Sequence, residues 1–229
     1  QLLDWLAREL RQHGWSQKHL VRHIVTSATY RQDSRRGAAD QEGDAENVLL
    51  HRHNVRPLEG EVLRDALLAV ADRLDPTLGG PSIEQPREAI ADARGAPKRL
   101  GPADGGGRRS LYLAVRRNFP HAMLQAFDQP TPFACVGARN RSNLPAQALT
   151  LVNDAFVRSS AERLATLVRT ATPHAAEQVR GLYRRCFARD PSDAELSRCL
   201  DFLAERDQAA AFADLAHALV TTTEFRFLR

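Results

Sequence analysis

Arginine and amide side chains gather in two stretches near the middle of the chain. The first, RRSLYLAVRRNFP, runs from Arg108 to Pro120, and the second, RNRSNLPAQALTLVN, runs from Arg139 to Asn153. Planar guanidinium groups bind carboxylate and sulfate through paired hydrogen bonds. The stretches therefore predict a corner that suits a small anion or a protein partner. The candidate binding residues are Arg109, Arg116, Arg117, Asn118, Asp128, Arg139, Asn140, Arg141 and Gln147.

Two uses of these arginines are open from the sequence. A helix beginning at Pro145 would add unpaired N–H groups and a partial positive charge to the corner, which favours anion binding. Alternatively, the arginines bridge loops to carbonyl oxygens and helix ends, with Asp128 as an ion-pair partner. An enzyme would need a desolvated carboxylate among them, and Asp128 is the one good candidate. No catalytic residue can be assigned, because GxSxG and HExxH motifs are absent.

Positive charge is concentrated in the same region of the sequence. The chain has 229 residues and a formal net charge of +4. Residues 98–141 hold eight basic and two acidic side chains, a local net of +6. A GC-rich genome would produce the same arginine bias without any binding role. No apolar run is long enough to span a membrane and no signal peptide is visible.

Two patterns resemble metal sites but lack parts of the motif. His19 and His23 have the i, i+4 spacing that lets two imidazoles reach one zinc ion, yet no Glu lies between them, so we interpret them as part of a solvated helix face. The acidic segment 40–46 lacks the glycine and closing glutamate of a calcium loop. There is no CxxCH haem motif. We therefore expect no metal and no cofactor in this chain.

Two further patterns concern phosphate and nucleic acid. The segment GGGRRS, residues 105–110, precedes a strand-like run, whereas a P-loop follows a strand and opens a helix. The helices expected around Gly14 could suggest a helix-turn-helix, but apolar Trp15 leads the second helix and the glycine lies too far from Ala7. We expect no nucleic-acid partner.

The cysteines are Cys135, Cys186 and Cys199. Cys186 and Cys199 lie on the two arms of a predicted helical hairpin that turns near Asp190, several residues out of level. Their Cα atoms are then expected to lie farther apart than the ~7 Å that a disulfide allows. Three free thiols are therefore expected.

Periodicity predicts a mainly α fold, a single helical domain over 1–229 with one small β element. The one strand is expected near 110–116, where apolar and polar residues alternate, paired with an extended piece of 79–107 or 131–138. Residues 79–107 are rich in glycine and proline and predict a long irregular loop. Ser16 and the Ser192/Glu195 capping box mark helix starts. Helices are expected at 2–13, 16–30, 58–74, 145–170, 173–188, 192–205 and 209–221.

Several motifs in order resemble a known family. They are LLDWLA, GWSQKHLVRHIVTSATYRQDS, LEGEVLRDALLAVADRLDPTLGGPS, RRSLYLAVRRNFP, FDQP and RNRSNLPAQALTLVND. Together they resemble a C-terminal domain of unknown function, family fifteen-fifty-three, of large planctomycete-type exported proteins. The resemblance covers nearly the whole chain. One departure is that Val21 and His23 stand where the family pattern suggests His and Leu, so these histidines are not a family metal site.

The resemblance carries expectations about context rather than chemistry. It implies an exported, periplasmic or cell-envelope setting and an upstream domain in the same polypeptide, often cytochrome c-like. It also implies that genes for sulfatase-like proteins lie nearby in the genome, and hence a link to anionic polysaccharide. The chain lacks an initiator Met and begins within a helical pattern, which predicts a C-terminal piece of a longer protein. We expect an accessory or binding domain. The alternative is part of a hydrolase-like or oxidoreductase-associated enzyme whose site an upstream domain completes.

Overall fold

The computed structural model describes residues 1–35, 44, 46–85, 100–204 and 208–228. The chain divides into two compact units. One comprises Gln1–Arg56 with the C-terminal end from Phe227, and the other is Pro57–Arg226. The expectation of one domain over 1–229 stays a prediction, because packing inside each unit does not test whether the two units fold together.

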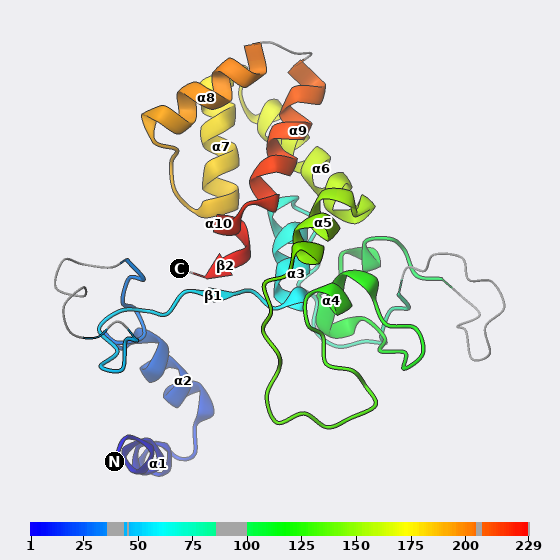
Figure 1. The fold of residues 1–229 in the computed structure, drawn as a ribbon. Helices are drawn as coiled ribbons and strands as arrows, with labels where there is room; N and C mark the ends of the chain where they lie inside the picture. The colour runs from blue at the N-terminus through cyan, green and yellow to red at the C-terminus, as the bar shows by residue number, and fades with distance from the viewer. Residues whose placement is uncertain (36–43, 45, 86–99, 205–207, 229) are drawn as a thin grey trace. The chain divides into compact units, whose positions relative to one another are not determined.

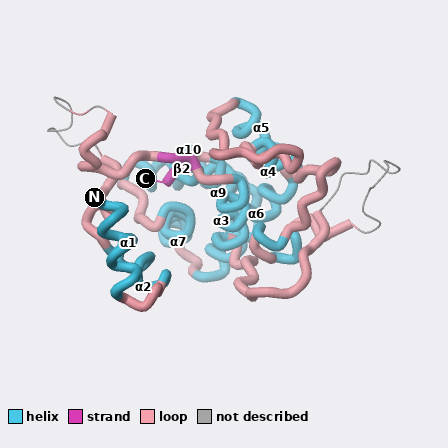
Figure 2. Tube along the Cα trace, turned by 90° about the horizontal axis from the view of Figure 1, so that it is seen from below, coloured by secondary structure: helices cyan, strands magenta, loops and turns pink. Residues whose placement is uncertain are grey.

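The mainly α prediction is confirmed, as the prevalence of helix in Figures 1 and 2 makes plain. Regular β structure in the described part of the chain is limited to one two-stranded sheet of β1 (Arg56–Pro57) and β2 (Phe227–Leu228). The helices are α1 (Leu2–Gln12), α2 (Gln17–Thr26), α3 (Gly60–Val70), α4 (Ala122–Ala126), α5 (Pro145–Asn153), α6 (Ala155–Ala171), α7 (Ala175–Phe187), α8 (Asp193–Ala204), α9 (Gln208–Thr221) and α10 (Thr223–Arg226).

The first unit contains the helix pair α1 and α2. Gly14 and Trp15 both take positive φ, 62° and 61°, and turn the chain between the helices. Ser16 then caps α2, because its hydroxyl accepts a hydrogen bond from the backbone N–H of His19. No residue of either helix is buried.

The acidic segment of the first unit can be followed only in part, because Asp40 and Glu42 lie outside the described residues. Asp44 accepts hydrogen bonds from the backbone N–H groups of Leu49 and Val48, at 2.8 Å each. These bonds hold the pKa of the Asp44 carboxyl below its ordinary value. This carboxylate therefore serves to close a turn.

The core of the second unit is built around α6. This helix packs against α3, α5, α7 and α9, and these helices are grouped together in both ribbon and tube views. The apolar residues on the facing sides recur at helical spacing, so each helix buries one stripe. Side chains that are fully buried include Leu63, Leu67, Leu68, Leu151, Val157, Leu164, Val179, Leu182, Ala216 and Val220.

The single helix expected over 145–170 is wrong, because the chain breaks at Asp154. The Asp154 carboxylate accepts from the backbone N–H groups of Phe156 and Val157, and so caps a new helix, α6. The break changes the register of the first part. Leu149 and Val152 are exposed, and α5 instead buries Leu151.

The prediction of a strand near 110–116 is also wrong. Ser110–Tyr112 form a short 3-10 turn, and Leu111 and Val115 are exposed while Leu113 is buried. The cause is a set of side-chain hydrogen bonds at Ser110. Its backbone N–H and its hydroxyl both donate to Asp65 at 2.7 Å, which holds the chain in a turn.

The sequence also predicted that the segment near 110–116 pairs with a piece of 79–107, and this pairing is confirmed at one point. Ile83 forms an isolated parallel bridge with Leu113, in which the Ile83 N–H donates to the Tyr112 oxygen at 2.8 Å. Residues 79–85 and 100–107 are irregular apart from a 3-10 turn at Gly105–Gly107. Residues 86–99 of the predicted loop lie outside the described residues.

The irregular segment 104–110 is fixed to α3 by a buried arginine. Arg64 is 1% exposed and donates to the backbone oxygens of Asp104 and Arg108, at 2.6 and 3.0 Å, and to the Ser110 hydroxyl at 3.1 Å. A buried guanidinium needs such partners, because an unsatisfied charge in the interior is costly. These three hydrogen bonds thus hold in place a segment that has no regular backbone pairing with a neighbouring strand.

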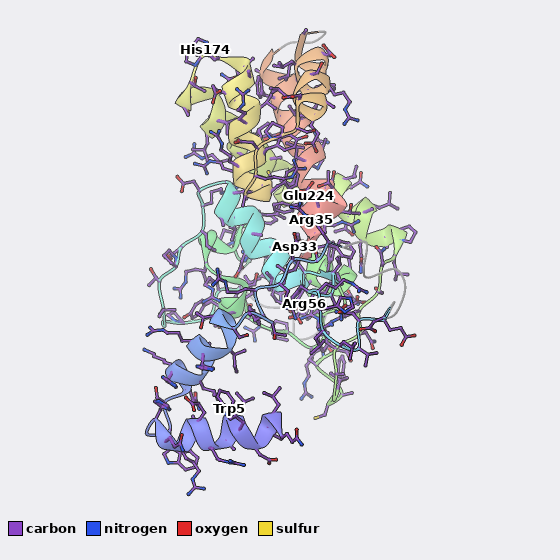
Figure 3. All side chains as sticks on the ribbon, turned by 90° about the vertical axis from the view of Figure 1, so that its left-hand side faces the viewer. Trp5, Asp33, Arg35, Arg56, His174 and Glu224 are labelled. Carbon is purple, nitrogen blue, oxygen red and sulfur yellow. The ribbon has the colours of Figure 1, made fainter. Side chains whose placement is uncertain are left out.

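The hairpin of α7 and α8 has the predicted capping box. The Ser192 N–H donates to the Glu195 carboxylate at 2.7 Å, and the Glu195 N–H donates back to the Ser192 hydroxyl at 3.3 Å. Arg189 binds Glu195 and also Glu224 of α10, which is labelled in Figure 3. Cys186 and Cys199 are free thiols, as expected, and so is the exposed Cys135.

Candidate functional site

Arg139, the centre of the second arginine stretch, is used inside the protein. Its guanidinium donates to the backbone oxygens of Asp128 and Phe127, at 3.0 and 3.1 Å. It also pairs with Glu61 at 2.8 Å and Glu59 at 3.4 Å, at the start of α3. Only 16% of the side chain is exposed. Arg139 therefore fastens its own loop to two other segments, and its donors are already taken.

Asp128 is fixed by a second local network. Its carboxylate accepts from the Ser142 backbone N–H at 2.7 Å and from the Ser142 hydroxyl at 2.8 and 2.9 Å. The buried Gln147 amide donates to the same serine, at 3.1 Å to its hydroxyl and 3.3 Å to its backbone oxygen. Asp128, Ser142 and Gln147 thus hold the loop that leads into α5.

The candidate arginines of the first stretch, Arg109, Arg116 and Arg117, have different surroundings. Arg109 lies 3.7 Å from Asp65. Arg116 forms an ion pair with Glu84, whose pKa is held below its ordinary value by the hydrogen bond from this guanidinium. Arg117 is exposed and makes no hydrogen bond or ion pair with any described residue. The five arginines therefore do not share one set of partners.

The other predicted site residues are Asn118, Asn140 and Arg141. All three side chains are exposed, and none is hydrogen-bonded within the described part of the chain. The predicted set therefore separates into three groups. Arg139, Asp128 and Gln147 build a loop, Arg109 and Arg116 face acids, and the rest are solvated.

A surface cavity of about 110 Å³ lies next to Arg117. Its wall is made by two segments, 115–120 and 125–133, with Gln85 from a third. The apolar part of the lining comes from Val115, Pro120, Pro130, Pro132 and Phe133. The polar part comes from Gln85, Arg116, Arg117, Gln125, Gln129 and Thr131.

The polar groups of this cavity differ in how far they are already engaged. The Gln85 amide donates to the Ala114 backbone oxygen, and Arg116 is paired with Glu84. Arg117 has no such partner among the described residues, so within that part of the chain its guanidinium is the one cation of the lining that can bind a ligand without leaving another group. Cavities that combine apolar walls with a few polar groups are typical of small-molecule sites.

Of the residues that line this cavity, only Arg116 and Arg117 were predicted from the sequence as site residues. The segment FDQPTPF, residues 127–133, supplies five of the other lining residues, Gln129 to Phe133. A signal was present, because two prolines separated by one residue predict a stiff, extended segment. That signal indicates rigidity, but it does not tell which face of the segment is exposed.

The described part of the chain contains no helix that is both long and apolar enough to cross a membrane. The fold and the cavity together define a mainly helical protein with a small surface pocket of mixed lining. The chain belongs to the family described as Protein of unknown function (DUF1553), whose profile matches residues 1–203. The family resemblance drawn from the sequence motifs is thereby confirmed. No curated protein and no solved structure matches the chain.

Proposed function

We propose that this chain is an accessory binding domain of an exported cell-envelope protein, and that its pocket takes an anionic sugar. The observation that carries the proposal is the guanidinium of Arg117, which is unpaired among the described residues and lies at the edge of a cavity lined by Phe133 and three prolines. The cell-envelope setting and the link to anionic polysaccharide come from the family resemblance. An upstream domain of the same polypeptide, cytochrome c-like or otherwise, is the proposed protein partner.

The lining suits a charged sugar for three physical reasons. The flat apolar side chains of Phe133, Pro130 and Pro132 offer a surface for the apolar face of a sugar ring. Side-chain amides such as Gln125 and Gln129 can both donate to and accept from hydroxyl groups. A guanidinium binds sulfate or carboxylate through paired hydrogen bonds, each worth about 1.5–3 kcal/mol when one partner is charged.

The enzyme alternative depended on Asp128 as a desolvated carboxylate completed by an upstream domain. In the structure this carboxylate is bonded to Ser142 and supports a loop. Among the described residues no observation favours a hydrolytic or oxidoreductive role.

Calorimetric titration of the chain with sulfated and unsulfated oligosaccharides tests the proposal. We expect binding of the sulfated sugar only, and a loss of at least about tenfold in affinity for Arg117→Gln, since one charge-assisted bond of about 1.5–3 kcal/mol corresponds to roughly 10- to 160-fold. Phe133→Ala should also weaken binding. Arg141→Gln is the matched control, because Arg141 is exposed, unpaired and outside the cavity.

Two results would contradict this proposal. One is an absence of heat with every anionic sugar tested. The other is an equal loss of affinity in Arg117→Gln and Arg141→Gln, which would indicate general charge attraction without a defined pocket.

A further inference from the structure

Two histidines and a glutamate come together where α1 meets α2. Glu9 and His13 lie four residues apart at the end of α1, and His19 lies in the first turn of α2. One ligand atom from each lies within 4.8 Å of the others. In the described part of the chain, this is the one group of three or more His, Cys, Asp or Glu side chains with that proximity. We propose that Glu9, His13 and His19 bind a zinc ion that joins the two helices.

The donor distances already approach those of a tetrahedral site. Glu9 Oε1 lies 3.2 Å from His13 Nδ1 and 3.2 Å from His19 Nε2. Zinc binds nitrogen and oxygen at ~2.0–2.2 Å, so neighbouring donors of a tetrahedral site are ~3.3–3.5 Å apart. Two imidazoles and one carboxylate form a known ligand set for zinc, with water in the fourth position.

Binding requires the imidazole rings to turn. The rings of His13 and His19 are stacked, with centroids 3.7 Å apart and planes within 12°. The lone pair of an imidazole nitrogen lies in the ring plane, so stacked rings do not both point at one ion. His13 must also release its hydrogen bond to the Glu9 backbone oxygen, at 3.0 Å. Both histidine side chains are about 40% exposed, which leaves them room to rotate.

The place of the cluster gives the ion a structural role. Neither α1 nor α2 has a buried residue, and Leu2, Leu3 and Val21 are each more than half exposed. A helix pair without a core gains little from apolar burial, and small units of this kind are often stabilised by a bound metal. Figure 1 shows α1 end-on and α2 lengthwise, so the helices cross rather than run parallel. A ligand set drawn from both would hold that crossing.

The expectation that no metal binds here was based on His19 and His23 alone. The structure leaves His23 outside the cluster, because its ring packs against Trp5 at 5.1 Å and lies 6.2 Å from the His19 ring, centroid to centroid. His23 is therefore a matched control on the same helix. Trp5, labelled in Figure 3, lies on α1, and Trp15 lies in the turn after it.

The test is a titration of the whole chain, freed of metal by a chelator, with zinc chloride by calorimetry. We expect one ion per chain, and affinities weakened by about 10- to 100-fold in each of Glu9→Gln, His13→Gln and His19→Gln. His23→Gln should bind zinc within about twofold of the unmodified chain. Because both tryptophans lie in or beside α1, their fluorescence should change on binding and respond to the same three substitutions.

Cobalt(II) provides a second measurement that does not depend on affinity. Its visible absorption should become that of a tetrahedral ion with mixed nitrogen and oxygen ligands, and this band should be absent in the three ligand variants. Circular dichroism should confirm that each variant keeps its helices. The proposal is overturned if zinc does not bind, if cobalt keeps its hydrated spectrum, or if His23→Gln weakens binding as much as the ligand variants.

Discussion

Ser142 donates both its backbone N–H and its hydroxyl to the carboxylate of Asp128, at 2.7 to 2.9 Å. This pair closes the loop between α4 and α5, and the Gln147 amide donates hydrogen bonds to the same serine. Asp128 also has a positive φ of 58°, a conformation that few residues other than glycine, asparagine and aspartate adopt without strain. Its identity is therefore constrained by both its backbone and its side chain.

The first prediction concerns this pair. Asp128→Ala should lower the free energy of unfolding by about 2–3 kcal/mol, because it removes the acceptor oxygens and places in the left-handed region an alanine, which lacks the short polar side chain that makes positive φ tolerable. Asp128→Asn should cost roughly half as much, since asparagine keeps one acceptor oxygen and tolerates positive φ. Urea unfolding measures both. Equal stability of all three proteins would mean that the network contributes nothing.

The second prediction separates structural from binding arginines. Arg139→Lys should lower the melting temperature by several degrees, because lysine cannot reproduce the four contacts of the guanidinium. The expected loss is about 1–2 kcal/mol, and each kcal/mol shifts Tm by ~2–4 °C in a chain of this size. Arg141→Lys, at an exposed and unpaired position, should leave Tm unchanged. Calorimetric melts of the two variants decide the point, and identical Tm values would contradict it.

The third prediction addresses the buried arginine. Arg64→Met should destabilise the protein by about 3 kcal/mol, because the Asp104 and Arg108 carbonyl oxygens lose their donor. The exposed Arg163, which has no bonded partner among the described residues, is the control, and Arg163→Met should change stability by less than ~0.5 kcal/mol. Chemical unfolding followed by circular dichroism measures both. A neutral Arg64→Met would show that methionine packing replaces the hydrogen bonds.

The fourth prediction is a pH dependence at the α7–α8 hairpin. The Arg189 hydrogen bonds lower the pKa of Glu195 from 4.5 to about 2 in the folded chain. Because the folded pKa is the lower one, the stabilisation is fully present above the unfolded value and is lost as pH falls from 4.5 toward about 2. Glu195→Gln should therefore melt lower than the unmodified protein at neutral pH, and the difference should shrink across this window. A Tm difference that does not change with pH would contradict the assignment.

The fifth prediction concerns thiol reactivity. Burial raises the pKa of Cys186 to about 12 and also raises that of Cys199, so both stay protonated and unreactive near neutral pH. Cys135 is exposed. A disulfide reagent should therefore modify one thiol quickly in the native protein and three after denaturation without reductant. Two fast thiols would indicate that the hairpin opens readily, and a denatured count of one would reveal a disulfide.

The sequence by itself determined the helical class, the family and several helix boundaries. Ser16 and the Ser192/Glu195 box cap helices where they were expected, and Gly14 turns the chain after α1. These features depend on residues within one turn of each other and on the 3.6-residue period of burial. Both can be read locally, because a helix satisfies its own backbone hydrogen bonds.

The predictions from sequence periodicity were wrong where a side chain formed hydrogen bonds with the backbone and ended a regular element. Alternation at 110–116 predicted a strand, but Asp65 of α3 captures Ser110 and turns the chain. The long helix over 145–170 was interrupted because the Asp154 carboxylate caps a new start. In the second case a signal was present in the sequence, since aspartate favours the N-cap position.

The use of each arginine was decided only by the tertiary structure. Arg139 reaches Glu61 across 78 residues, and Arg117, one residue from the paired Arg116, is left free beside a cavity. Glu9 and His13 are neighbours on one helix end, whereas His19 meets them only because a turn brings α2 back to α1. Residue type supplies the hydrogen-bonding capacity of a side chain, whereas its partners depend on how distant segments pack. Long-range packing is not encoded in any local pattern, and for this reason the sequence predicted the candidate arginines but not their grouping.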